Sequence, residues 1–511
     1  MTRTLVLLAT ALVLLDATII AVLSAYNFDI NDNMYAVAPF ARGALYRDVH
    51  FVQGPVTFYF LKMIASIVPE GFAYVGFRVV SAGLVVATLL VGTFLCIDRW
   101  PSRCLFLAFA GTDVYFIYPG LEIGSYSLPL FLLALATASL WKIRNRQIAI
   151  GAAAVLIGLA ACAKLNHVLF FVPLAAFVIL ERHKDEGRSD WARTALLPFV
   201  VCGIVGSLPV IVSFAQAPMA FVLNALVFHS KFSLGALSLG KGALFGIAAN
   251  LLIDWAAAGG AVFVALGIYA TFIDRDSDRR SRHLLVFAMC GAVAGLVAAL
   301  SPGMTYVQYW APLTFFAALA GARFFDRTRL NPVLICVLTL FPLLTVGVGD
   351  LRSQLSNNLK ATSGTPKVVT VVAVNRTLKT YADRVNDTSQ CDKRIFSLAG
   401  AFVVDSGFRL GSYMEGGWFW TWVSAHVPQS YIADKRYHLD EYLIFPEKWV
   451  RDQHINFLVV GYYPGSHSEE DLEKYALERA FGVVTFPVWK GSTLKFYFNP
   501  DCMRQDRVRP I

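Results

Sequence analysis

A polar stretch of about thirty residues near the N-terminus carries the side chains best suited to chemistry. It runs from Tyr26 to Pro55, follows a hydrophobic run long enough to cross a bilayer, and reads YNFDINDNMYAVAPFARGALYRDVHFVQGP. Its ionisable residues are Asp29, Asp32, Arg42, Arg47, Asp48 and His50. A carboxylate at the boundary of water and lipid can accept a proton from a hydroxyl group, and partial burial raises its pKa toward a useful value. The stretch therefore predicts proton transfer at a membrane face.

Two acids in this stretch compete for the role of catalytic base. Asp32 directly precedes the segment NMYAVAPFA, where an Asp side chain commonly N-caps a helix, so its carboxylate has a structural alternative. Asp29 has no comparable alternative, and we expect it to be the base, although the choice between the two stays open. Asp48 and His50 are candidates to bind an acceptor or a metal ion.

The composition indicates what kind of protein positions these side chains. Of 511 residues, 57% are hydrophobic and 15% are charged, and the mean hydropathy is +0.57. About a quarter of the residues of a soluble protein are charged, so this chain is an integral membrane protein. A span needs roughly 20 apolar helical residues, because in lipid only the helix satisfies its own backbone. About eleven runs qualify, near 4–25, 72–97, 104–119, 124–141, 147–163, 166–180, 194–215, 243–273, 283–300, 304–322 and 331–349.

The distribution of Lys and Arg predicts the orientation of these spans. With the N-terminus in the cytoplasm, every inner loop has at least two Lys or Arg, and the outer loops have few. These inner loops read DRWPSR, WKIRNRQ, ERHKDEGRSDWAR, DRDSDRRSR and RFFDRTRLN. The positive-inside rule then places the polar stretch, and everything after about residue 350, outside. The same loops account for the net charge of +9, so we expect no nucleic-acid partner.

The composition changes near residue 350, which divides the chain into a transmembrane domain, 1–350, and an extracytoplasmic domain, 351–511. In the second domain, KRIFSLA, INFLVVG, VVTFPVW and TLKFYFN read as strands, and SEEDLEKYALERAF reads as a helix. A further helix is expected within 366–386, so an α/β fold is predicted. Cys391 and Cys502 are the only cysteines of this domain, and an oxidising compartment favours a disulfide between them.

Several stretches together resemble a known class of membrane enzymes. They are ARGALYRDVHFVQGPVTFYFLKM, GFRVVSAG at the start of the second span, GLAACAKLNHVLFFVPL, and SPGMTYVQYWAPLTFFAALAG. In order and spacing over roughly residues 1–350, they resemble the polyprenyl-phosphate-sugar-dependent glycosyltransferases of the GT-C class. That class includes protein O-mannosyltransferases and aminoarabinose transferases. The resemblance implies a GT-C fold of about eleven transmembrane helices.

The resemblance also implies where the acids of the site lie. The class places its catalytic acid soon after the first span, commonly as an Asp-Glu or Asp-Asp pair. This chain has Asp29-Ile30-Asn31-Asp32 instead, and counting back from Gly43 favours Asp29. Members also carry an acid in the second outer loop, where Glu122 is the candidate for binding an acceptor or a metal ion. A requirement for Mg²⁺ or Mn²⁺ stays open.

A donor of this class leaves as polyprenyl phosphate, so the resemblance implies cations near the outer interface. Arg78 lies about two turns inside the second span, and Lys164 and His167 lie near the outer ends of the fifth and sixth spans. We expect all three to bind the donor phosphate; snorkelling or an internal ion pair is the alternative for each. Tyr306, Tyr309 and Trp310 are candidates for contact with lipid or sugar, although aromatic residues are common at membrane interfaces without a ligand.

These features predict an inverting hexosyl- or pentosyltransferase on the outer face of a bacterial inner membrane. It would move a sugar from a polyprenyl-phosphate donor to a hydroxyl group of a glycan, lipid or protein. The rival interpretation is a transporter or flippase for a lipid-linked glycan, with a proton relay through Asp16, Asp113 and Asp254. A catalytically inactive relative is a third interpretation, because the adjacent acid pair is missing.

Overall fold

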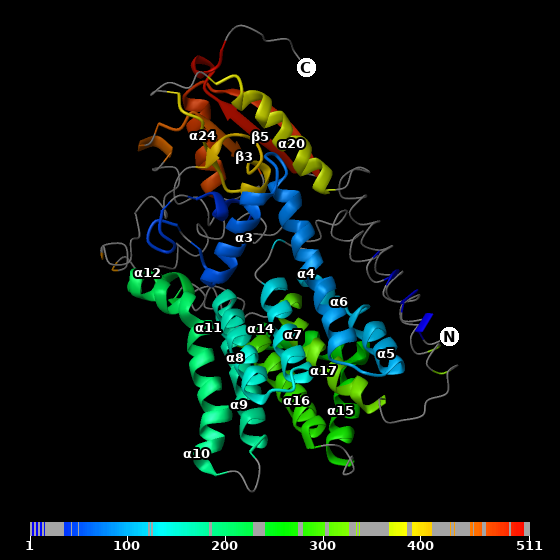
Figure 1. The fold of residues 1–511 in the computed structure, drawn as a ribbon. Coiled ribbons are helices and arrows are strands. Elements are labelled where there is room, and N and C mark those ends of the chain that lie inside the picture. The colour runs from blue at the N-terminus through cyan, green and yellow to red at the C-terminus, as the bar shows by residue number, and fades with distance from the viewer. Residues whose placement is uncertain are drawn as a thin grey trace.

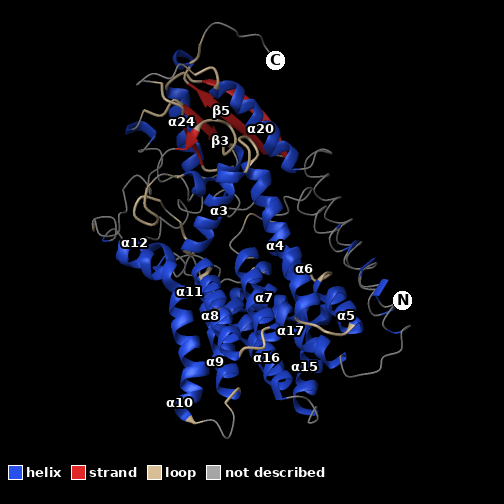
Figure 2. Cartoon of the chain, in the orientation of Figure 1, coloured by secondary structure: helices blue, strands red, loops and turns tan. Residues whose placement is uncertain are grey.

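The computed structural model describes most of the helical region and the core of the C-terminal region. Described are residues 35–41, 43–49, 51–120, 123, 126–182, 187–227, 241–273, 279–301, 306–325, 367–385, 391–410, 450–452, 454–461, 467–489 and 492–504, with isolated positions elsewhere. A helical bundle lies beneath a small sheet flanked by helices (Figures 1 and 2). This arrangement has the mainly helical character that the sequence predicts.

The described helices of the bundle lie between residues 55 and 325. They are α3 (Pro55–Ile67), α4 (Ala73–Leu95), α5 (Trp100–Ala110), α6 (Val114–Ile117), α7 (Ser127–Lys142), α8 (Arg146–Ala163), α9 (Phe171–Leu180), α10 (Arg188–Trp191), α11 (Leu197–Gln216), α12 (Pro218–Val222), α14 (Lys241–Trp255), α15 (Ala261–Ile273), α16 (Arg279–Leu300) and α17 (Ala311–Phe325). Short 3-10 and π-helical segments connect or extend these helices. The 3-10 segments are η1 (Ala38–Phe40), η2 (Tyr118–Gly120), η3 (Leu165–Phe170) and η8 (Val307–Trp310). The π-helical segments are η4 (Ala192–Leu196), η5 (Leu223–Val227) and η7 (Ala256–Gly260).

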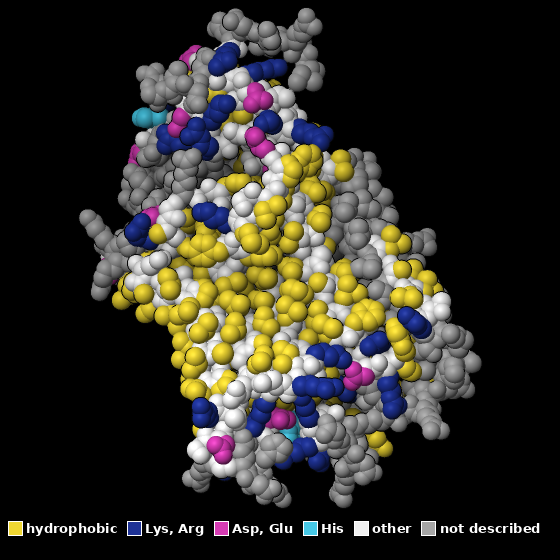
Figure 3. Space-filling view, in the orientation of Figure 1, with side chains coloured by type: hydrophobic (Ala, Val, Ile, Leu, Met, Phe, Trp, Pro, Cys, Tyr) yellow, Lys and Arg dark blue, Asp and Glu magenta, His cyan; other side chains and the backbone are white. Residues whose placement is uncertain are grey.

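Several of these helices can cross a membrane. Among the described residues, the segments long and apolar enough are Ala73–Leu95, Arg146–Ala163, Ser189–Gln216, Phe245–Thr271 and Arg279–Leu300. On the face that Figure 3 shows, hydrophobic side chains cover the middle of the molecule, and Lys and Arg lie over the sheet region and at the opposite end of the bundle. The protein is therefore a multi-pass membrane protein. The number of about eleven spans stays a prediction, because the expected first and last spans fall mostly outside the described residues.

Two expected spans are interrupted. The run at 104–119 divides into α5 and α6, because Asp113 N-caps α6 through a 3.0 Å hydrogen bond from the Tyr115 amide to Oδ1. The run at 243–273 is interrupted in its middle, where Gly259 adopts φ +112 inside η7. Only a residue without Cβ takes that conformation readily.

Close backbone contact joins α8 and α11. A Cβ atom on Gly158 of α8 would lie 2.7 Å from the backbone of Gly206 in α11. Small residues allow such an approach, which gives membrane helices the van der Waals contact that the hydrophobic effect cannot supply in lipid. A larger side chain at either position would force the two helices apart.

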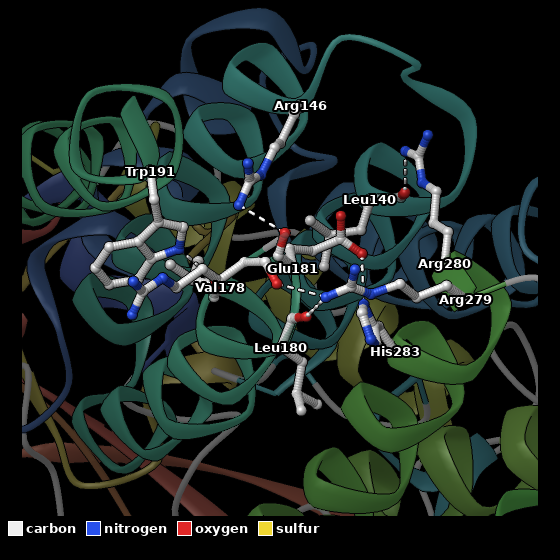
Figure 4. Close-up of polar contacts among 10 residues, drawn as sticks. Leu140, Arg146, Val178, Leu180, Glu181, Trp191, Arg279, Arg280 and His283 are labelled. Carbon is white, nitrogen blue, oxygen red and sulfur yellow. Dashed lines mark hydrogen bonds and ion pairs between the residues drawn. The ribbon is translucent and has the colours of Figure 1, made fainter. Parts of the chain in front are cut away.

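Arginine side chains cap helix ends at the end of the bundle farthest from the sheet (Figure 4). Arg280 donates to the carbonyl of Leu140 in the last turn of α7 at 2.9 Å, and Arg146 donates to the carbonyl of Glu181 at the end of α9 at 2.8 Å. The Glu181 carboxylate also lies 2.8 Å from Nδ1 of His283. Because the last carbonyls of a helix have no partner within it, these cations satisfy them and oppose the negative end of the helix dipole.

The C-terminal region contains a mixed five-stranded sheet in the order β2-β1-β3-β5-β4. The strands are β1 (Arg394–Ser397), β2 (Arg409–Leu410), β3 (Phe457–Val460), β4 (Gly482–Trp489) and β5 (Ser492–Phe498), with helices α20 (Lys367–Ala382) and α24 (His467–Glu478). The β1 strand pairs parallel with β2 and β3, and β5 pairs antiparallel with β3 and β4. All four strand segments expected from the sequence form strands. The boundary expected near residue 350 lies outside the described residues.

A disulfide joins Cys391 and Cys502, the pair expected from the sequence, with Cα atoms 5.3 Å apart. A bridge between Val385 and Met503 lies beside it, so the segment after β5 closes against the residues that follow α20. The disulfide thereby joins the segments that flank the described part of the sheet.

The sheet region and the helical bundle share one hydrophobic core. Phe77 of α4 and Phe496 of β5 belong to the same cluster of buried residues. A polar contact accompanies it, because the Asp405 carboxylate accepts hydrogen bonds from the amides of Ala73 (2.9 Å) and Tyr74 (3.1 Å). Those amides begin α4, and Phe72, its own N-cap residue, supplies no side-chain hydrogen bond. Asp405 therefore caps a bundle helix from more than 300 residues away.

Candidate active site

A cavity of about 160 Å³ lies where α3, α8, η5 and η8 meet, on the side of the bundle that faces the sheet. Its lining residues are Val52, Gln53, Gly54, Lys164, Leu165, Asn166, Ala225, Ser301 and Tyr309. We call this space the Lys164 cavity. Its wall combines the end of the polar N-terminal stretch with residues more than 100 positions later. Among the described residues, we therefore take this cavity as the candidate active site.

Lys164 supplies the positive charge of the cavity. The residue ends α8 in an extended conformation, and its side chain is 6% exposed. Its ammonium lies 3.6 Å from the ring centroid of Tyr126 and 5.1 Å from that of Tyr309. It also donates to Oε1 of Gln53 at 3.4 Å. Aromatic faces stabilise a cation, and an ammonium at the wall of a cavity suits an anion such as a phosphate.

The polar stretch is fixed to α8 by direct backbone contact. The Gly54 amide donates to the Ala163 carbonyl at 3.2 Å, and the Thr57 hydroxyl donates to the same carbonyl at 3.1 Å. A Cβ atom on Gly54 would lie 2.0 Å from the carbonyl oxygen of Cys162, so no other residue fits this position unchanged. The contact places Gln53 beside Lys164.

A buried tyrosine holds the same segment from the other side. The Tyr46 hydroxyl donates to the Gln53 carbonyl at 2.5 Å, and its ring packs edge-on against Phe221 at 5.1 Å. Tyr46 is fully buried and adopts φ +67, a left-handed conformation that a bulky residue rarely takes. Strain of this kind persists where surrounding contacts enforce it, so the geometry of Gln53 is fixed rather than adaptable.

Hydrogen bonds also fix the far wall of the cavity. Asn166 Nδ2 and Ser301 Oγ each donate to the carbonyl of Ala298, near the end of α16, at 3.0 Å. His167 Nδ1 lies 2.9 Å from Oδ1 of Asn166. His167 is 2% exposed and is not among the cavity-lining residues. His167 therefore contacts Asn166 behind the cavity wall, and its role at the donor phosphate stays a prediction.

The three expected aromatic contacts fall in different places. Tyr309 lines the Lys164 cavity, and its ring lies 5.6 Å from that of Tyr306 and 5.0 Å from that of Tyr126. Trp310 is fully buried in the core of the bundle, 6.1 Å from the ring of Tyr115. Tyr309 is thus the member of the three that lines the cavity.

Arg78 lies in α4 and does not line the Lys164 cavity. Its side chain is 2% exposed, and the guanidinium lies 5.9 Å from the ring centroid of Tyr74, one turn earlier in the helix. The described residues therefore do not bring Arg78 and Lys164 to one cavity. Its role at the donor phosphate stays a prediction.

Asp48 closes a turn within the polar stretch. Its Oδ2 accepts from the Ala44 amide at 2.7 Å and from Arg47 at 2.8 Å. Gly43, at φ +109, packs against the same side chain, and a Cβ atom there would lie 2.4 Å from Cβ of Asp48. These contacts stabilise the turn, and the role of Asp48 in binding an acceptor or a metal ion stays a prediction. The remaining expected acids and histidine of the site, Asp29, Asp32, His50 and Glu122, lie outside the described residues.

In the described part of the chain, no three His, Cys, Asp or Glu side chains come together in a way that could hold a metal ion. An Mg²⁺ or Mn²⁺ requirement therefore stays open. Sequence reasoning missed Gln53, Gly54 and Tyr126 as residues around the cation. The Gly-Pro pair before α3 was a usable signal for a fixed turn at Gly54, but nothing local to Tyr126 marks its contact with Lys164.

Comparison with known proteins places this arrangement in a recognised fold. No family model matches the chain, and no curated protein matches it in sequence. Several solved structures match over nearly its full length. ArnT from Cupriavidus metallidurans bound to undecaprenyl phosphate has a TM-score of 0.57 and 12% identity over 99% of each chain. The apo state of that ArnT has a TM-score of 0.58 and 11% identity, over 98% of this chain and 99% of that one.

A more distant match is the apo oligosaccharyltransferase of Archaeoglobus fulgidus, with a TM-score of 0.47 and 12% identity over 98% of this chain and 75% of that one. The likeness to ArnT confirms the GT-C type of fold that the sequence predicts.

Proposed function

We propose that this protein is an inverting membrane glycosyltransferase that moves a sugar from a polyprenyl-phosphate donor to a hydroxyl group. The Lys164 cavity is the observation that carries the proposal. A buried ammonium at its wall suits the phosphate of such a donor, and the fold is shared with an ArnT that was solved with undecaprenyl phosphate bound. The acceptor is a glycan, a lipid or a protein.

The proposed reaction is a single displacement. The acceptor oxygen forms a bond to the anomeric carbon, the bond from that carbon to the phosphate oxygen breaks, and Asp29 takes the acceptor proton. Negative charge grows on the departing polyprenyl phosphate, where Lys164 stabilises it. Attack from the face opposite the leaving group inverts the anomeric configuration. Arg78 is the second cation that the sequence assigns to this phosphate.

The proposed setting is the inner membrane of a bacterium, with the N-terminus in the cytoplasm. Residues 351–511 then form a periplasmic domain, which lies over the end of the bundle that contains the Lys164 cavity and shapes the acceptor groove. The arginine-capped end of the bundle (Figure 4) faces the cytoplasm in this orientation, as the positive-inside rule requires.

A transfer assay tests the proposal. Purified protein in nanodiscs would receive labelled hexosyl and pentosyl polyprenyl phosphates, with an envelope extract as acceptor, with and without EDTA. Release of polyprenyl phosphate that depends on the extract is the expected result.

Asp29→Asn should lower turnover about 100- to 10,000-fold, because it removes the proton acceptor and changes the shape little. Asp32→Asn should have a smaller effect, because Asn caps helices as well as Asp. A larger loss in Asp32→Asn would reverse this assignment. Movement of intact donor across the bilayer without sugar transfer would favour the transporter interpretation.

A further inference from the structure

A second and larger cavity, of about 590 Å³, lies between α5, α6, the α14–α15 pair and α17. None of the residues that line it lines the Lys164 cavity. Most of its wall is apolar, and the stacked rings of Phe109 and Phe263, with centroids 4.2 Å apart, form part of it. Asp113 and Asp254 are its two charged residues. We call it the Asp254 cavity.

The cavity exists because two helices are interrupted beside it. Asp113 begins α6 after a break at the end of α5, and Gly259 breaks the path from α14 to α15 at φ +112. A Cβ atom on Gly259 would reach the Phe109 ring at 3.5 Å, an ordinary contact distance. Both interruptions contribute lining residues, so the space is built into the backbone rather than left by a missing side chain.

Asp113 is held in place by the protein. Its Oδ2 accepts from the Thr314 hydroxyl at 2.6 Å, and the same hydroxyl accepts from the indole N–H of Trp255 at 2.9 Å. Its Oδ1 accepts from the Tyr115 amide. The side chain is 5% exposed. Asp113 is therefore a fixed polar residue at the wall, with both carboxylate oxygens in use.

Asp254 differs, because it is exposed and lies within the candidate span Phe245–Thr271. In the parts of the chain that the structure describes, it makes no hydrogen bond or ion pair. A carboxylate at the centre of a transmembrane helix costs about 2.5–3.5 kcal/mol on the insertion scale, and such residues usually mark a partner. We expect the partner of Asp254 to carry positive charge, because such a group would pair with the carboxylate. The cavity walls beside that carboxylate are mostly apolar.

We propose that the Asp254 cavity binds an amphiphile with an alkyl chain and a protonated amine. The chain occupies the apolar space beside Phe109 and Phe263, and the ammonium pairs with the Asp254 carboxylate. The charges of the two cavities favour different ligands. Asp113 and Asp254 would repel the phosphate of a polyprenyl-phosphate donor from the Asp254 cavity, whereas Lys164 would attract that phosphate to the Lys164 cavity. The inference does not depend on the glycosyltransferase proposal.

A photolabelling experiment tests this site. The full protein in phosphatidylcholine nanodiscs would be labelled with a diazirine derivative of dodecylamine, and the labelled peptides would be mapped. Dodecylamine, dodecanol and dodecyl phosphate, which share one chain length, would serve as competitors. We expect labels on α5, α6, α14, α15 or α17, and strong competition by dodecylamine alone.

Variants separate the charge from the space. Asp254→Asn should weaken dodecylamine binding about tenfold or more, because a charge-assisted hydrogen bond is lost. Asp254→Glu should retain most of the affinity. Asp190→Asn, an exposed acid in α10 far from the cavity, is the matched control and should change nothing. Thermal unfolding of each variant checks that the fold is intact.

Three results would overturn the proposal. If dodecanol or dodecyl phosphate competed as strongly as dodecylamine, the cavity would bind any alkyl chain without regard to charge. Labels confined to other helices would show that the amine binds elsewhere. Unchanged affinity in a folded Asp254→Asn variant would remove the carboxylate from the site.

Discussion

Replacement of Lys164 by methionine tests the centre of the proposed donor site. Methionine keeps an unbranched chain of similar length beside Tyr126 and Tyr309, but it removes the ammonium. The side chain is 94% buried, so solvent screens the lost interaction little. Binding of polyprenyl phosphate should therefore weaken, while the shape of the Lys164 cavity stays nearly the same.

The magnitude follows from the surroundings of the ammonium. Loss of one charge-assisted hydrogen bond to phosphate costs about 1.5–3 kcal/mol, which is about 10- to 150-fold in the dissociation constant. The effect on folding should be small, because two contributions oppose each other. The cation–π contact with Tyr126, at 3.6 Å, is lost at a cost of about 2 kcal/mol, and the desolvation of a buried charge is no longer required.

The assay is direct binding of a short polyprenyl phosphate to protein in nanodiscs at two salt concentrations. Lys62→Met in α3 is the matched control, because Lys62 is exposed and its ammonium lies 5.6 Å from the ring centroid of Phe58, outside the cavity. Wild type and Lys62→Met should bind equally. Equal affinity in a folded Lys164→Met variant would refute the reasoning, and so would an equal loss for an uncharged polyprenol, since that would indicate damage to the chain-binding surface.

Three further predictions concern stability. Gly54→Ala should lower the free energy of unfolding by about 3 kcal/mol or more, because its Cβ meets a carbonyl oxygen at 2.0 Å. Gly83→Ala, in open space on α4, should instead raise it by up to about 1 kcal/mol, because Ala favours a helix more than Gly does; thermal unfolding compares the two variants. Asp405→Ala should cost about 1–2 kcal/mol through the uncapped end of α4. Burial raises the pKa of the Asp405 carboxyl above its ordinary 3.8. The part of its stabilisation that is linked to protonation is therefore complete below pH 3.8 and is lost as pH rises through the raised pKa. Titration of the melting temperature should show this loss in wild type and not in Asp405→Asn. Cys502→Ser should destabilise the C-terminal region by about 4–5 kcal/mol, and a non-reduced digest of wild type should contain the Cys391–Cys502 peptide.

The helices and strands were largely predictable from the sequence, because their signals are local. Apolar runs and Lys- and Arg-rich loops predicted the bundle, and short β-branched or aromatic runs predicted the strands of the sheet region. Interruptions inside apolar runs were harder. Neither Asp113 nor Gly259 stops a hydrophobic run, so hydropathy alone does not show that the helix ends there and begins again.

The candidate site was predictable only in part. Lys164 stood out as a cation near the end of a span, and the structure places it at a cavity. Its neighbours Gln53 and Tyr126 come from distant segments, and only tertiary packing joins them. Asp48 shows the opposite limit. Its charge suggested chemistry, but its contacts close a local turn, and a sequence pattern alone does not separate these two uses of a carboxylate.

The cap that Asp405 places on α4 also sets an order of assembly. Synthesis runs from the N-terminus, so α4 emerges some 330 residues before the carboxylate that completes its first turn. Until that carboxylate arrives, the amides of Ala73 and Tyr74 depend on water or lipid headgroups. A chain that stops before residue 405 keeps its bundle helices but lacks the cap and the shared core. The first turn of α4 thus completes these hydrogen bonds only in a chain that extends to Asp405.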